Sequence, residues 1–85
     1  MTWLAKPTSG QPTDASKLVA DEFIESYVRW REACEDVRRT YARWRECEPA
    51  QRGHAFDSYR AALDREEHAA HIYCDSSARV RAFDR

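Results

Sequence analysis

A six-residue pattern occurs twice in this chain and sets the spacing of its aromatic residues. The segment YVRWRE at residues 27–32 returns 14 residues later as YARWRE at residues 41–46. Fourteen residues are two heptads, so both copies face the same side of a supercoiled helix. The same three-four spacing runs on through Ala20, Phe23, Tyr27, Trp30, Cys34, Val37, Tyr41 and Trp44. It predicts a long helix whose apolar seam packs lengthwise against another helix.

A turn and a second helix are expected around Pro49. A residue before proline avoids the helical conformation, and proline suits the first position of the next helix. We expect a first helix over residues 13–47 with Thr13 as its N-cap, a turn over residues 48–53, and a second helix over residues 54–81. Residues 1–12 hold two of the three prolines and one of the two glycines, so they are expected to form a flexible tail before a hairpin domain at 13–85.

The second segment has an apolar seam of its own. Its members are Phe56, Tyr59, Leu63, Glu66, Ala70, Tyr73, Ser77 and Val80. Beside it runs a row of small residues that lets two helix backbones approach closely, namely Ala55, Ala62, Ala69 and Ser76. Folding the chain at residues 49–51 gives the facing pairs Trp44 with Phe56, Tyr41 with Tyr59, Tyr27 with Tyr73, and Ala20 with Val80. Because the two seams match throughout, the sequence predicts an all-α, coiled-coil-like antiparallel hairpin.

A lone two-helix hairpin leaves one side of each seam open to water, and a chain of this size buries only a thin core. Further apolar residues are expected at the end of the hairpin away from the turn. We therefore expect two copies to dimerise into a four-helix bundle. The expected contact residues are Phe23, Ile24, Tyr27, Val28, Trp30, Tyr41, Trp44, Ile72, Tyr73 and Phe83. This pattern favours a small non-catalytic protein–protein interaction module, an adaptor or regulator whose protein partner the sequence does not identify.

Composition narrows the classes of function. With 14 basic and 15 acidic residues, the chain lacks the overall basic character of a nucleic-acid binder. It contains no apolar run of membrane-spanning length and no signal-peptide core, so a cytoplasmic protein is expected. Three cysteines that the hairpin keeps apart fit a reducing compartment. Neither a nucleophile elbow nor a glycine-rich phosphate loop is present, so we expect no catalysis and no cofactor.

A basic hairpin tip supports an alternative function, binding of nucleic acid. Its residues are Arg38, Arg39, Arg43, Arg45 and Arg52. Arginine next to tryptophan suits stacking and cation–π contacts with bases. Both tryptophans of the repeat fall on the seam, however, so we favour a structural interpretation in which the arginine stems cover apolar surface.

A second alternative is a metal-binding helical bundle. Its candidate ligands are Glu66, Glu67, His68 and His71. Carboxylates and imidazoles at helical spacing can hold a metal ion, but His68 and His71 occupy outward positions in the heptad frame, which favours a solvated charged surface. Glu66 is the single charge in the seam; it is either an acid–base or metal residue, or a polar group that fixes the register with Arg38 as its partner.

Overall fold

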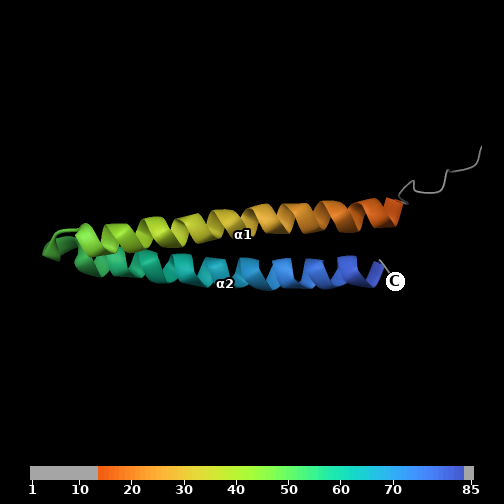
Figure 1. Cartoon of the computed structure of the whole chain (residues 1–85). Helices are drawn as coiled ribbons and strands as arrows, with labels where there is room; N and C mark the ends of the chain where they lie inside the picture. The colour runs from red at the N-terminus through yellow and green to blue at the C-terminus, as the bar shows by residue number, and fades with distance from the viewer. Residues whose placement is uncertain (1–13, 84–85) are drawn as a thin grey trace, which may run out of the picture.

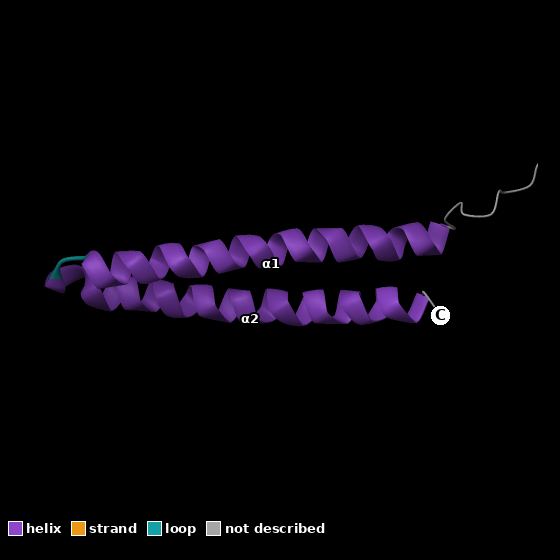
Figure 2. Ribbon diagram, viewed as in Figure 1, coloured by secondary structure: helices purple, strands orange, loops and turns teal. Residues whose placement is uncertain are grey.

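Two long antiparallel helices joined by a tight turn make up the described part of the chain. The structure, a computed structural model, describes residues 14–83. Helix α1 spans Asp14–Glu46, a single 3-10 turn η1 spans Pro49–Gln51, and α2 spans Arg52–Phe83. The helices run side by side over their whole length, with the turn at one end and the start of α1 beside the end of α2 at the other (Figure 1). Figure 2 shows helix throughout except at the turn, which confirms the expected all-α hairpin.

Pro49 produces the turn in the way the sequence predicts. Glu48, the residue before it, is extended (φ −72°, ψ 152°), and Pro49 opens η1. The Gln51 N–H donates a hydrogen bond to the Glu48 carbonyl at 2.8 Å, which closes the turn. Gly53 is the second residue of α2, so α2 begins slightly earlier than expected. The predicted N-cap Thr13 and the predicted tail at residues 1–12 lie outside the described residues.

Small side chains fill the deepest layer between the helices. Ala62 has no exposed surface, and Ala55, Ser26 and Ser76 are also buried. On α2 this layer follows the predicted row of small residues. On α1 it follows the line Ser26, Ala33 and Thr40, and it continues to Cys47 just after the helix; all four are buried or half-buried. Because both facing lines are small, the two backbones approach closely and the larger rings lie to one side.

The rotation of α1 about its own axis differs from the sequence expectation. Tyr27 and Tyr41, expected in the centre of the seam, remain 41% and 40% exposed, and Ala20 is exposed as well. Ser26 and Thr40 lie deeper instead. The Ser26 hydroxyl donates to the Phe23 carbonyl at 2.9 Å, and the Thr40 hydroxyl contacts the Asp36 carbonyl at 2.8 Å. Since both hydroxyls find partners within their own helix, they enter the interface at little cost.

Ion pairs join the helices along the edge opposite the rings. Arg65 reaches Asp36 at 3.3 Å, and Arg79 reaches Glu22 at 3.1 Å. All four side chains retain substantial exposure to solvent, so each pair contributes only modestly to stability. Both pairs lie on the edge that the small-residue interface brings together.

Asp36 makes the stability of the hairpin depend on pH. Hydrogen bonds from Arg39 and then from Arg65 lower the pKa of this carboxyl below its ordinary value of 3.8. A carboxyl whose pKa is lower in the folded state contributes stability above its unfolded pKa and loses it as pH falls through the folded value. We expect Asp36→Asn to lower the urea midpoint at pH 7 and to flatten its decline below pH of about 4.

Denaturation followed by circular dichroism from neutral to acid pH measures this effect. Arg65→Ala provides the matched test, since it should lower the midpoint in the parent and have little effect once Asp36 is asparagine. Equal effects of Arg65→Ala in the two backgrounds would show that the pair does not contribute.

Candidate functional site

One long side of the hairpin is covered by aromatic rings in two clusters, which we call the aromatic face. The cluster near the open end consists of Phe23, Tyr27, Trp30 and Tyr73, and the cluster near the turn consists of Tyr41, Trp44, Phe56 and Tyr59. Both clusters take rings from both helices. The face therefore depends on the antiparallel register, and neither helix supplies it alone.

The ring contacts confirm the predicted pairing. The ring centroids are 5.1 Å apart for Trp44 and Phe56, 5.4 Å for Tyr41 and Tyr59, and 5.6 Å for Tyr27 and Tyr73. Such distances are typical of favourable aromatic pairs, each contributing about 0.5–1.5 kcal/mol beyond area burial. The layers of the hairpin are thus those that the heptad spacing predicts.

Each cluster has a tyrosine of α2 as its central ring, Tyr73 near the open end and Tyr59 near the turn. Tyr73 stacks on Trp30 with the planes 4° apart, and it also stacks on Phe23 with centroids 5.6 Å apart. Tyr59 stacks on Trp44 with the planes 11° apart. Each tryptophan of the repeat therefore has one ring face occupied within the hairpin.

The aromatic face is open to solvent. Tyr27, Tyr41, Phe56 and Leu63 all lie on it, and each is roughly two-fifths exposed. Exposed apolar surface to which two helices contribute makes this side of the hairpin a candidate interaction surface. It is the most extensive candidate for function in the described part of the chain.

Glu66 contacts a different partner from the one expected. The indole N–H of Trp30 donates to the Glu66 carboxylate at 2.9 Å across the helix interface. The predicted partner, Arg38, instead pairs with Glu35 on its own helix, so that part of the prediction was wrong. A hydrogen bond from Trp30 fixes both the ring orientation and the alignment of the helices, which supports the register role for Glu66.

The candidate metal ligands point to different sides of α2. Glu66 faces Trp30, His68 lines a groove on the opposite edge, and both Glu67 and His71 are exposed. Within residues 14–83, no three His, Cys, Asp or Glu side chains gather in a way that suits a metal ion. The helical spacing that motivated this alternative does not bring the four side chains together.

The arginines of the predicted basic tip are partly neutralised. Arg38 pairs with Glu35, and Arg39 pairs with Asp36. Arg45 donates to the Tyr41 hydroxyl at 3.1 Å, with its guanidinium carbon 5.6 Å from the centre of that ring. Arg43 and Arg52 are exposed near the turn. Carboxylates beside the first two arginines weaken the positive potential available for phosphate.

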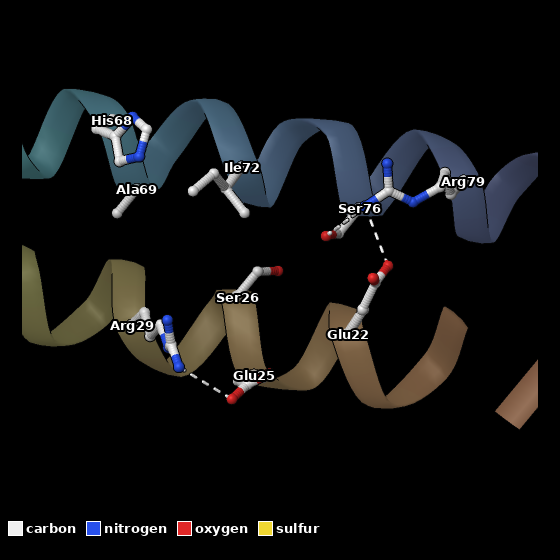
Figure 3. Close-up of a pocket in the computed structure, with 9 residues that line it drawn as sticks. All are labelled: Glu22, Glu25, Ser26, Arg29, His68, Ala69, Ile72, Ser76 and Arg79. Carbon is white, nitrogen blue, oxygen red and sulfur yellow. Dashed lines mark hydrogen bonds and ion pairs between the residues drawn. The ribbon is translucent and has the colours of Figure 1, made fainter. Parts of the chain in front are cut away.

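A shallow groove of about 350 Å³ lies on the other side of the hairpin, which we call the groove side (Figure 3). Sequence reasoning did not find it. Its floor is formed by Ser26, Ala69 and Ser76, whose small side chains leave the space, so the row of small residues was the available signal. In the close-up, Arg79 points toward Glu22 and Arg29 toward Glu25, so its charged groups are satisfied by one another.

The apolar residues expected at the open end do not form one surface. Ile24 and Val28 are exposed on α1 beside Tyr27, and they extend the aromatic face. Ile72 lines the groove on the other side, and Phe83 is the last residue of α2. The structure thus separates a set that the sequence analysis treated as a single patch.

Cys34, Cys47 and Cys74 are all free thiols, as the hairpin geometry predicted. Within the described residues, neither helix has a stretch that is apolar enough over the length needed to span a bilayer.

Comparison with protein-family models, with curated proteins and with solved structures found no match for this chain. Its class therefore rests on its own geometry, which is that of an all-α helical hairpin with one open aromatic face.

Proposed function

We propose that this protein is a small non-catalytic protein–protein interaction module, and that its aromatic face binds one or two additional helices. The observation that carries the proposal is the exposure of apolar side chains from both helices along one side of the hairpin. A third or fourth helix laid along this side would complete the packing that two helices leave unfinished. Adaptors and regulators bind amphipathic helices on exposed apolar surfaces of this kind.

Two features make the alternatives weaker. Bases bind to aromatic platforms through exposed ring faces, whereas Trp30 and Trp44 lie nearly parallel to Tyr73 and Tyr59 at stacking distance. A metal-binding bundle needs converging ligands, and Glu66 is engaged by Trp30 while His68 lies on the groove side. An interaction surface needs neither condition.

The sequence-based expectation is that a second copy covers the aromatic face and completes a four-helix bundle. Two variants with matched exposure test whether this face mediates the association. Leu63 on the aromatic face is 39% exposed, and Ile72 on the groove side is 44% exposed. We expect Leu63→Glu to abolish self-association in sedimentation at micromolar concentration, and Ile72→Glu to leave it unchanged, because only the first places a charge in the interface.

Binding of an apolar fluorescent dye to the parent chain and to the two variants completes the test. If the parent is a monomer that binds the dye, and Leu63→Glu removes that binding, the aromatic face is still a docking surface, but its occupant is not a second copy. A compact monomer that exposes no apolar surface, with the same dye response in all three proteins, would contradict the proposed function.

A further inference from the structure

Both edges of the aromatic face carry a row of exposed residues spaced seven apart. We call these two rows the rim. On α1 the rim consists of Lys17, Ile24, Arg31, Arg38 and Arg45, and on α2 it consists of Arg60, Glu67, Cys74 and Arg81. Each row lies one heptad position outside the rings, so its side chains reach past them toward whatever covers the face.

The rim is strongly cationic in a chain that is nearly neutral. Its charged members are all Lys or Arg except Glu67, whereas the whole chain has a net charge of −1. The acidic residues therefore lie elsewhere. Asp21 and Glu35 follow the next line outward on α1, and Asp57 and Asp64 lie on the outer side of α2. Arg38 pairs with Glu35 on that outer line, so the positive charge that the docking face offers a partner comes mainly from the other rim cations.

This distribution discriminates between possible occupants of the face. A second copy packed face to face would bring one cationic rim against another, and like charges across an interface oppose association. Residues 1–13 of the chain itself contain one lysine and no acidic residue, so they offer no charge complement. A helix with acidic flanks supplies both the apolar stripe and the opposite charge.

We propose that the occupant of the aromatic face is an amphipathic α-helix of another protein, whose apolar stripe is flanked by Asp and Glu residues. This inference rests on the proposed interaction function and specifies the chemistry of its partner. The rim of α1 extends from Lys17 to Arg45. At 1.5 Å per residue this is about 40 Å, the length of a helix of about four heptads. Self-association through the face is then weaker than binding of an acidic helix, which displaces the second copy.

The test uses two fluorescein-labelled peptides of about four heptads, each with Leu and Ala along one stripe. The flanking positions are Glu in one peptide and Lys in the other. Anisotropy with the full chain is measured over a series of salt concentrations. We expect the Glu peptide to bind one to one, at least about tenfold more tightly than the Lys peptide, with an affinity that falls as salt increases.

Two double variants with the same change in charge assign the binding to the rim. Arg31→Glu with Arg60→Glu reverses one charge on each edge of the aromatic face. Arg29→Glu with Arg43→Glu makes the same change on the groove side of α1. We expect the first to weaken binding of the Glu peptide by about tenfold or more and the second by less than about twofold. Circular dichroism checks that both variants are folded.

The possible outcomes distinguish a failure of the acidic-partner inference from a failure of the proposed interaction function. Equal binding of the two peptides, or tighter binding of the Lys peptide, would overturn the acidic partner while keeping a docking face. A dimer that the Glu peptide fails to dissociate would assign the face to a second copy. A monomer that binds neither peptide and no apolar dye would overturn both proposals.

Discussion

Replacement of Ala62 by leucine is expected to destabilise the hairpin by about 2 kcal/mol or more. Ala62 has no exposed surface and lies in the layer of small residues where the helices are closest. A leucine there has no space to occupy, so it must push the helices apart and disturb the ring contacts on either side. Thermal and urea unfolding followed by circular dichroism measure the loss.

Ala61→Leu is the matched control, because it makes the same change one residue away at an exposed position. Leucine and alanine both favour helix, so this variant should unfold within about 0.5 kcal/mol of the parent. Equal stability of the two variants would mean that the helices do not approach through the small residues.

Loss of the Trp30 ring is the second large effect. Trp30 stacks on Tyr73 at 5.3 Å, contacts Tyr27, and donates to Glu66. Full truncation of a buried aromatic residue costs about 3–5 kcal/mol, and Trp30 is half-buried, so Trp30→Ala should cost about 2–3 kcal/mol. Part of this loss arises because Glu66 is left beside apolar side chains without its donor.

Trp30→Phe separates the contribution of ring packing from that of the hydrogen bond to Glu66. Phenylalanine keeps a ring beside Tyr73 but has no N–H, so we expect a smaller loss of about 1 kcal/mol. Combining it with Glu66→Leu, which removes the unpartnered carboxylate, should restore much of that loss. A Trp30→Phe variant as unstable as Trp30→Ala would show that packing of the indole, and not its hydrogen bond, dominates.

The layer pairing of the hairpin is well predicted by the sequence. The repeat and the matching seams place Trp44 beside Phe56 and Tyr27 beside Tyr73, and both pairs of rings are in contact. Pro49 is a strong local signal for the turn because it restricts the residue before it whatever the rest of the chain does. These predictions succeeded because spacing along a helix translates directly into height along a hairpin.

The partners of Glu66 and Arg38 were not predictable in the same way. Arg38 is one turn from the correct height, but its nearest carboxylate, Glu35, is on its own helix. Trp30 was assigned only an apolar role, although its N–H is a donor that needs a partner when the ring is half-buried. Side-chain direction, which spacing does not specify, decided both contacts.

The sequence by itself determined the two helices, the position of the turn and the height at which the paired aromatic rings meet. Only the tertiary structure decided how α1 is rotated about its axis. The line of Phe23 and Trp30 keeps three-four spacing with Tyr27 on one side and equally with Ser26 on the other, so periodicity does not choose between them. Ser26 lies inside because it allows close approach to the small row of α2, and that choice leaves the aromatic rings and their cationic rim facing outward.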